Sequence, residues 1–293
     1  MKNIKYILIF AVLIASGKLF AQQDPSYTLY KYNMNIINPA YAGTNGHTEL
    51  NLNIRSQWIG LKGSPETQSL SFAKPINDKV GIGFTVVNDQ VDIIKETDFT
   101  VDFSYRVQVS ETSDLFLGVK AGGYSLRVDL QSKGQIGDPA FAENVSRFNP
   151  IFGAGAYLKV KKFYATLSIP NFLNNNRVEN SDFTEATDKT HIFLGAGYEF
   201  DLNDNLKFSP SIMTRFVQGA PSSIDLTGTF DIQDKVELGG SYRLDDSFSA
   251  LALIKLGDWM KLGYAYEFTT SDVRDYSDGS HEIMLRFNLS GGK

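Results

Sequence analysis

The sequence contains no cysteine, only two tryptophans and only three histidines, His47, His191 and His281. Without cysteine the protein has no disulfide framework, no thiolate metal site and no cysteine nucleophile. The HExxH pattern of zinc proteases and a GxSxG nucleophile elbow are absent as well. We therefore expect a protein that is not an enzyme and that has no catalytic residue, no cofactor and no metal.

A long apolar run is also missing. The chain begins with Lys2 and Lys5 and a short apolar stretch over residues 6–16, and Ala21 stands at a favourable cleavage point before Gln22. This pattern is typical of a secretory signal peptide over residues 1–21, with a retained anchor helix as the alternative. Beyond it no segment has about eighteen consecutive apolar residues, which excludes an α-helical membrane protein.

An excess of positive charge is absent too. Without residues 1–21 the chain carries 25 Lys and Arg against 33 Asp and Glu, a net charge of −8. A mildly acidic chain is not expected to bind nucleic acid, because nucleic-acid phosphates require basic patches. The class of the protein has to be inferred from the order of its residues.

What the sequence has in abundance is alternation. In residues 99–109 the odd positions are apolar and the even positions polar, beginning with Phe99 and Thr100. Residues 48–58 and 259–268 show the same period of two, and about fourteen such runs lie between Thr48 and Leu289. Because successive strand side chains point to opposite faces, each run predicts a strand with one apolar and one polar face.

The links between these runs alternate in length. Short links such as residues 77–78 and 233–235 alternate with longer ones such as 126–151 and 170–189, although residues 245–247 are short where a long link is due. Outer-membrane barrels have an even strand number, short periplasmic turns and longer outer loops. We therefore predict an all-β fold, a transmembrane antiparallel β-barrel of about fourteen strands in the cell outer membrane, with both termini periplasmic.

A soluble β protein, with its apolar face in a core, is the alternative. The runs are near ten residues long, whereas strands of soluble proteins usually have about five or six. Aromatic residues also stand at the ends of the apolar faces, as they do in the girdles at lipid interfaces. Both features favour the membrane barrel.

The polar faces of the predicted strands carry recurrent glycines. Because glycine weakens a strand, its repetition indicates either that something approaches closely inside the barrel or that the glycines relieve crowding in a tilted wall. The sequence leaves both interpretations open. The glycines are Gly81, Gly83, Gly118, Gly122, Gly153, Gly155, Gly195, Gly197, Gly239 and Gly263.

Residues 22–45 lack the alternation. Tyrosines and apolar residues recur there at spacings of three and four, namely Tyr27, Tyr30, Met34 and Ile37. This spacing is compatible with a short helix that Asn38-Pro39 ends. We predict a signal peptide over 1–21, an N-terminal periplasmic or plug-like segment over 22–46 that caps the periplasmic mouth, and an outer-membrane barrel over 47–293. A flexible periplasmic lead is the alternative for the second segment.

Two groups of side chains look chemically suggestive. Ser280, His281 and Glu282 have the composition of a catalytic triad, but neighbours on a strand point to opposite faces and cannot converge. The aspartates of residues 272–278 could bind a hard cation, yet their spacing is not that of an EF-hand, and a solvated outer loop is the alternative.

Three blocks of the sequence together resemble one family. The first runs from Asp24-Pro25 to the sequence NPAYAG at residues 38–43. The second contains Arg55-Ser56-Gln57-Trp58, Pro65 and residues 67–69, and the third is GSHEIML at residues 279–285. In this combination the chain is similar to the PorP/SprF family over its whole length after the signal peptide.

The resemblance implies an outer-membrane barrel of the type IX secretion and gliding motility machinery, without enzymatic activity. Its partners would be the lipid bilayer of the outer membrane, a secreted adhesin or other type IX cargo, and periplasmic secretion-machinery or peptidoglycan-associated proteins. The candidates for partner or plug contacts are Tyr27, Tyr30, Asn33, Asn38, Pro39, Tyr41, Gly43, Arg55, Trp58, His281 and Glu282.

The expected function is therefore protein secretion: the barrel supports export or surface attachment of secreted adhesin-like proteins, with links 126–151 and 170–189 as the surface that holds them. The alternative is an outer-membrane channel or transporter for small or hydrophobic solutes, in which the N-terminal segment serves as a hatch.

Overall fold

The computed structural model describes residues 25–133, 143–173, 176–180, 183–187, 189–218 and 220–289. The predicted signal peptide and residues 22–24 lie outside the described residues. No helix in the described part of the chain is long and apolar enough to cross a membrane.

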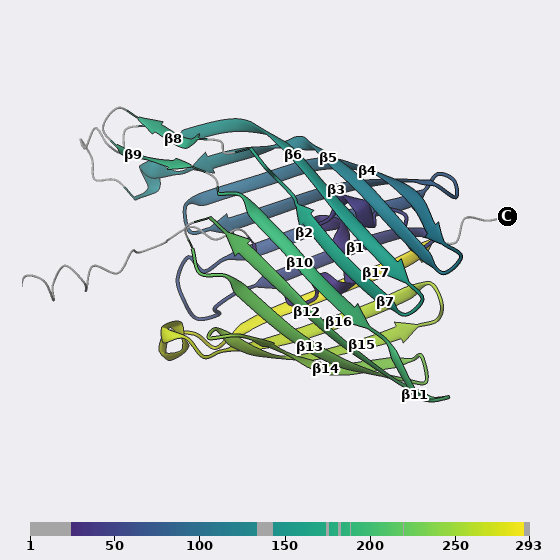
Figure 1. Cartoon of the computed structure of the whole chain (residues 1–293). Coiled ribbons are helices and arrows are strands. Elements are labelled where there is room, and N and C mark those ends of the chain that lie inside the picture. Colours follow the sequence, from purple (N-terminus) through teal and green to yellow (C-terminus); the bar gives the residue numbers. More distant parts are fainter. Residues whose placement is uncertain are drawn as a thin grey trace, which may run out of the picture.

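The wall strands form a closed antiparallel barrel (Figure 1). Among the described residues its sheet has fifteen strands, and an additional pairing of β10 with β12 joins the two ends of the sheet. β10 (His191–Tyr198) and β11 (Phe200–Asn203) follow one another and both pair with β12 (Leu206–Val217), so they form one interrupted strand. The barrel therefore has fourteen strands, which confirms the predicted fold and strand number.

The other wall strands begin and end close to the predicted runs, except that β4, β5 and β6 extend further. They are β1 (Thr48–Ser56), β2 (Glu66–Pro75), β3 (Val80–Val91), β4 (Ile94–Ser110), β5 (Ser113–Val128), β6 (Val145–Val160), β7 (Phe163–Ile169), β13 (Ser223–Ile232), β14 (Val236–Arg243), β15 (Ser247–Leu256), β16 (Met260–Thr269) and β17 (Ser280–Leu289). β1 pairs with both β2 and β17, so the first and last strands are neighbours.

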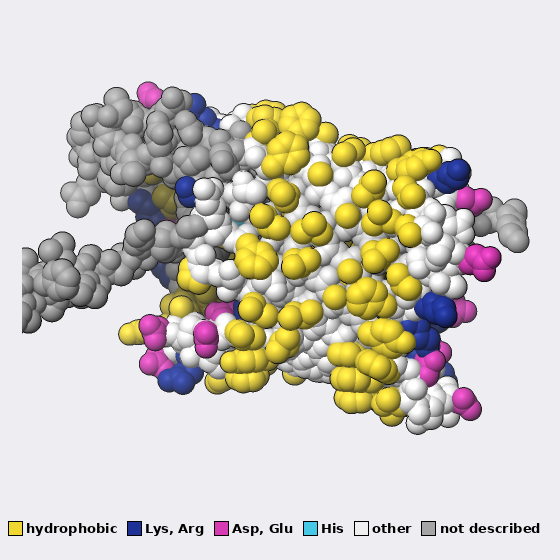
Figure 2. Space-filling model, in the orientation of Figure 1, with side chains coloured by type: hydrophobic (Ala, Val, Ile, Leu, Met, Phe, Trp, Pro, Cys, Tyr) yellow, Lys and Arg dark blue, Asp and Glu magenta, His cyan; other side chains and the backbone are white. Residues whose placement is uncertain are grey.

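The alternation places apolar side chains outside the barrel and polar ones inside. On β4, Val101 and Phe103 are 57% and 46% exposed, whereas Asp102 between them is completely buried. Figure 2 shows the resulting band of apolar side chains on the face in view, with charged groups at its ends. This arrangement inverts that of a soluble protein and suits a wall that faces lipid.

One end of the barrel carries only short links, for example residues 161–162 between β6 and β7; we call it the short-link end. At the opposite, long-link end two connections are tight. Residues 244–246 form a short link between β14 and β15, as predicted for this position where the alternation would call for a long one, and Asp245 in it has a φ of 57°. The predicted long link 89–98 is wrong, because pairing continues on both sides and leaves only Asp92, at a φ of 52°, and Ile93 between β3 and β4.

The strands β4, β5 and β6 extend further toward the long-link end than the alternation predicts. In these extensions the inward positions carry apolar residues such as Ile94, Leu126 and Val128, which pack in one cluster, while the outward residues Lys95 and Arg127 are charged. The expected pattern is therefore lost, although the hydrogen-bonded ladder continues to Val128 and Val145. A small hairpin of β8 (Asn176–Asn180) and β9 (Phe183–Thr187), which the sequence did not predict, lies in the link between β7 and β10 (Figure 1).

The core lies inside the barrel and is built around residues 25–45. One buried cluster joins Met34, Ile37, Ala40 and Tyr41 to Phe116, Tyr157 and Met213 of the wall. A second joins Leu29 and Tyr32 to Leu251, Leu253, Ala265 and Met284. The segment that lacks the alternation is therefore the central packing element of the protein.

Candidate functional site inside the barrel

Residues 25–45, here called the lumenal segment, pass through the barrel from one end to the other. Pro25 lies at the long-link end, where it lines a cavity together with Glu96 and Lys189. Asn45 lies at the short-link end, where its amide donates to Glu49 near the start of β1 at 2.8 Å. This placement differs from the prediction of a segment at the periplasmic mouth, because charged groups near the long-link end bind the beginning of the segment.

The backbone of the lumenal segment forms three short 3₁₀ turns instead of the predicted helix. They are η1 (Tyr30–Tyr32), η2 (Met34–Ile36) and η3 (Pro39–Tyr41). Asn38 is extended and caps η3, its side chain accepting the backbone N–H of Ala40 at 2.9 Å, so Asn38-Pro39 starts a turn as well as ending one. Short turns suit a segment whose backbone groups are shared with the surrounding wall.

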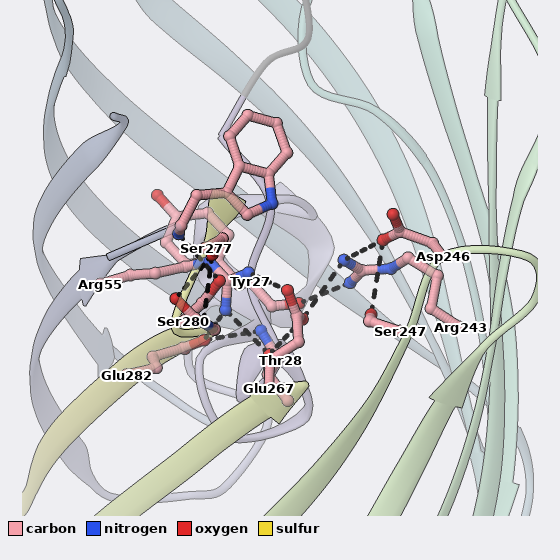
Figure 3. A network of polar contacts seen from close by, with 12 residues as sticks. Tyr27, Thr28, Arg55, Arg243, Asp246, Ser247, Glu267, Ser277, Ser280 and Glu282 are labelled. Carbon is pink, nitrogen blue, oxygen red and sulfur yellow. Dashed lines mark hydrogen bonds and ion pairs between the residues drawn. The ribbon is translucent and has the colours of Figure 1, made fainter. Parts of the chain in front are cut away.

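The first anchor is a buried ion-pair network at the start of the segment (Figure 3). Glu282 accepts the backbone N–H of Thr28 at 2.6 Å and that of Leu29 at 3.2 Å. Arg55 donates to the Thr28 hydroxyl at 3.0 Å and pairs with Glu282 at 3.3 Å and with Glu267 at 2.7 Å. The side chains of Arg55, Glu267 and Glu282 are 3% exposed or less, so each charge is compensated by its neighbours.

Arg243 continues the network across the barrel. Its guanidinium pairs with Asp225 at 2.7 Å and with Glu267 at 3.5 Å, and donates to the carbonyl of Tyr27 at 3.4 Å. The Tyr30 hydroxyl donates to the same Asp225 at 3.0 Å. Five strands, β1, β13, β14, β16 and β17, thus contribute charged groups to one anchor.

A second anchor surrounds Tyr32. Its hydroxyl donates to Glu237 at 2.5 Å, and Lys31 and Lys261 lie 3.6 and 3.4 Å from that carboxylate. Lys261 also lies over the Tyr32 ring, 5.5 Å from its centre. The Tyr32 side chain is buried, and its hydroxyl is the donor in the hydrogen bond to Glu237.

A third anchor holds the middle of the segment. The amide of Asn35 donates to Asp102 at 3.1 Å, and Lys120 pairs with Asp102 at 3.2 Å. The Lys120 ammonium also donates to the carbonyls of Asn35 and Ile36, both at 3.3 Å. Lys120 and Asp102 face each other from neighbouring strands, so one buried pair positions two consecutive peptide groups.

Four lumen-facing glycines make room for the segment. A methyl group at Gly81 would overlap the carbonyl of Ala42, and one at Gly118 would overlap the backbone of Pro39 and Ala40. Gly83 and Gly155 face the side chains of Asn35 and Asn38 in the same way. At these four positions the interpretation of an occupied lumen is right; the neighbours of the other six predicted glycines belong to the wall and its links.

The predicted site residues divide into two groups. Most lie in or against the lumenal segment, among them Tyr27, Tyr30, Arg55 and Glu282 of the first anchor. Asn33 accepts a hydrogen bond from Ser71, and Asn38 donates one to Thr166. Pro39 and Tyr41 are buried in η3, and Gly43 adopts a φ of 75° against Pro75 and Gly81. Trp58 and His281 do not join them. Trp58 lies in the link after β1 at the long-link end, with a φ of 51°, and its backbone N–H donates to the Ser280 hydroxyl.

His281 faces outward, where its Nδ1 lies 2.7 Å from the Tyr264 hydroxyl, while Ser280 and Glu282 point inward and are completely buried. The three residues therefore do not converge, as predicted. The aspartates of the 272–278 loop include Asp275, which pairs with Arg274 at 3.3 Å. No group of His, Asp or Glu able to hold a metal ion occurs among the described residues.

Several partners in the anchors were missed by sequence analysis, namely Glu237, Glu267, Asp225, Arg243, Asp102 and Lys120. All of them occupy inward positions on strands whose outer face is apolar. That parity was available from the sequence, and a list of charged residues at inward positions would have found them. Which of them pair with one another depends on strand order across the barrel and could not be inferred.

A sequence model of the type IX secretion system membrane protein PorP/SprF matches residues 19–287. The chain belongs to the PorP/SprF family. The described residues of the three blocks lie in the lumenal segment, in the end of β1 with the following link and the beginning of β2, and in β17 with the residue before it. In this PorP/SprF chain the three blocks meet at one place, because Thr28, Arg55 and Glu282 form the first anchor.

Solved structures show the same architecture as this PorP/SprF protein. The Acinetobacter baumannii outer membrane protein Omp33 superposes with a TM-score of 0.51 and 6% identity, over 83% of this chain and 98% of that one. The Ralstonia pickettii toluene transporter TbuX superposes with a TM-score of 0.50 and 11% identity, over 87% and 92%. A comparison with curated protein sequences finds no match. The family and the barrel place the protein in the outer membrane.

Proposed function

We propose that this PorP/SprF chain is a non-enzymatic docking component of the type IX secretion machinery, which supports export or surface attachment of secreted adhesin-like proteins. The observation that carries the proposal is the occupied lumen. Three buried polar anchors tie the lumenal segment to strands around the wall. A filled barrel of this kind suits a fixed platform whose outer links hold a partner, and suits less well an open pore.

Two surfaces are available to partners. At the long-link end the two longest connections, between β5 and β6 and between β7 and β10, are the candidates for contact with cargo. At the short-link end a polar cavity of about 310 Å³ is lined by charged residues that include Asp234, Lys235, Lys255 and Arg286. We assign this second surface to periplasmic components of the machinery.

The proposal is tested in a strain that lacks this chain. Cargo released into the medium and cargo displayed on the cell are measured separately. Loss of either, restored by the wild-type chain, supports docking, and a chain in which residues 129–144 are replaced by a two-residue turn should fold but fail to restore display. If the deletion strain exports and displays all type IX cargo normally, the proposal is rejected.

A channel with the lumenal segment as its hatch is the second candidate. It is favoured by a cavity of about 130 Å³ beside the start of the segment, which has Tyr27, Ile37, Val87, Ile151 and Phe193 among its lining. The fold similarity to a toluene transporter is consistent with it. Planar-bilayer conductance separates the two candidates: a hatch predicts that deleting residues 22–45 raises the conductance, and an unchanged conductance argues against any plugging role.

A further inference from the structure

The outward face of the wall carries two adjacent cations just beyond the apolar band at the long-link end. Lys95 on β4 and Arg127 on β5 are direct partners in the strand register, and both side chains are exposed. Phe99 lies four residues from Lys95 on the same strand and is 47% exposed. Since side chains four residues apart on a strand share a face, Lys95 and Arg127 point outward like the lipid-facing residues.

The level of this pair along the barrel follows from strand geometry. On β4 the apolar outward residues run from Phe99 to Val109. Ten residue steps of about 3.3 Å, tilted by about 40°, span roughly 25 Å along the membrane normal, which is the height of the apolar band of such barrels. Thr97 then lies about 5 Å and Lys95 about 10 Å beyond its edge, at the level of lipid headgroups.

The register extends this level across neighbouring strands. One row joins Gln90 of β3, Lys95 of β4, Arg127 of β5 and Ser146 of β6. The next row, closer to the apolar band, is polar on β3, β4 and β5, with Asn88, Thr97 and Ser125, and ends on β6 at the exposed Phe148. The following row begins the apolar band with Leu70, Val86 and Phe99. The two cations therefore stand at the centre of a polar strip that continues the lipid-facing surface.

The two charges are not compensated by the sheet. Like charges directly opposite each other destabilise an antiparallel pair, since their Cβ atoms are only about 5 Å apart. The nearby carboxylates have other partners: Asp92 pairs with Lys133 at 2.9 Å, Asp129 accepts the backbone N–H of Ser132, and Glu66 accepts the Gln68 amide. Among the described residues no ion pair joins Lys95 or Arg127 to an acid.

We propose that Lys95 and Arg127 bind the phosphate group of a phosphorylated glycolipid in the outer leaflet. A phosphate between them relieves the repulsion of the two cations, the planar guanidinium of Arg127 can donate two parallel hydrogen bonds, and Lys95 supplies a point charge. Acyl chains below the headgroup contact the apolar rows of β3 and β4. The long stems of both side chains allow their charged ends to bend toward the membrane surface.

The test uses the purified full chain in detergent and a diphosphorylated lipid A, with its dephosphorylated form and inorganic phosphate as competing probes. Lipid bound per barrel is measured by native mass spectrometry, and the dissociation constant by titration. The double variant Lys95→Gln/Arg127→Gln should weaken binding of the phosphorylated lipid about tenfold or more, because two charge-assisted contacts are lost. The matched control is Lys74→Gln, an exposed outward position at the short-link end of β2.

Thermal unfolding gives a second readout, the difference in stability between the double variant and wild type. If the two residues had only a structural role, adding the lipid would not reverse the sign of this difference. Without lipid the double variant should be at least as stable as wild type, because the like-charge pair is gone; with phosphorylated lipid the wild type should be the more stable. The proposal is overturned if the double variant binds the lipid as tightly as wild type, if the dephosphorylated lipid binds equally well, or if inorganic phosphate alone displaces the lipid. Loss of a protein partner with unchanged lipid binding would also overturn it.

Discussion

The carboxylate of Glu282 accepts the backbone N–H of Thr28 at 2.6 Å, a contact between residues 254 positions apart. The same carboxylate accepts the Asn53 amide at 2.7 Å and pairs with Arg55. β17 and β1 are also the strands where the two ends of the barrel sequence meet. Closure of the wall and binding of the lumenal segment therefore depend on the same side chain, and we expect them to form one cooperative unit.

Replacing Glu282 by Gln should destabilise the barrel by about 3–5 kcal/mol, the range for breaking a buried ion pair by changing one partner. Arg55 would keep Glu267 but lose its second carboxylate, and the Thr28 N–H would lose a charged acceptor. Unfolding in urea, followed by fluorescence of the two tryptophans, measures the change.

His281→Gln is the matched control, because the neighbouring side chain points outward, where it contacts the rings of Tyr264 and Tyr266. Its effect should be within about 0.5–1 kcal/mol, as for exposed substitutions. Equal unfolding midpoints for the two variants would show that the first anchor contributes nothing to stability.

Gly118→Ala should destabilise the protein by about 1–3 kcal/mol, the cost of overpacking a core. The added methyl group would overlap the backbone of Pro39 and Ala40, which cannot move aside without displacing η3. Gly240→Ala is the control, since its methyl group would face outward with the Ser249 carbonyl at 3.3 Å as its nearest neighbour. Heat-modifiable migration in gels reports the folded fraction, and identical curves for both variants would contradict a tightly fitted segment.

The wall was predictable because its information is local. In a strand such as β4 consecutive residues point alternately into the barrel and toward the lipid, and the lipid-facing residue at every second position has to be apolar. The short turns were predictable for the same reason. The extensions of β4 to β6 were not, because there apolar residues such as Leu126 face inward and charged residues such as Lys95 face outward, the reverse of the pattern that identifies a lipid-facing strand.

The lumenal segment was predictable in composition but not in path. Its lack of alternation and the glycines opposite it, such as Gly81 and Gly118, indicated something inside the barrel. Its direction depends on which end of the lumen offers acceptors for Thr28 and Leu29, and Glu282 does so only after β17 has paired with β1. A contact over 254 positions leaves no periodic signal in the sequence.

Stability should fall in alkaline solution through the tyrosines of the lumenal segment. Tyr27 and Tyr32 are 6% exposed, and an ionised phenol is costly to bury. Above about pH 10, where a free phenol ionises, the unfolded chain can lose these protons more easily than the folded chain, so the stability should fall as the pH rises further.

Tyrosinate absorbance during an alkaline titration should therefore show a group of tyrosines that ionise only together with unfolding. Tyr32→Phe should cost about 1 kcal/mol at neutral pH, for its hydrogen bond to Glu237, yet move the alkaline unfolding midpoint to higher pH. Tyr276→Phe, at a 72% exposed position, should change neither. Ionisation of all tyrosines near pH 10 in a still folded barrel would refute the burial of the segment.

The direction of the lumenal segment can be measured by cysteine labelling in intact cells. The chain has no native cysteine, so Pro25→Cys introduces a single thiol. Pro25 lies at the long-link end, which faces outward in outer-membrane barrels. A membrane-impermeant maleimide should therefore label it at a rate comparable with Lys189→Cys at the same mouth. Lys79→Cys, in an exposed short link between β2 and β3, should react only after the cells are opened. Labelling of Pro25→Cys only in opened cells, with Lys189→Cys labelled from outside, would place the start of the segment at the periplasmic mouth and reverse its path through the barrel.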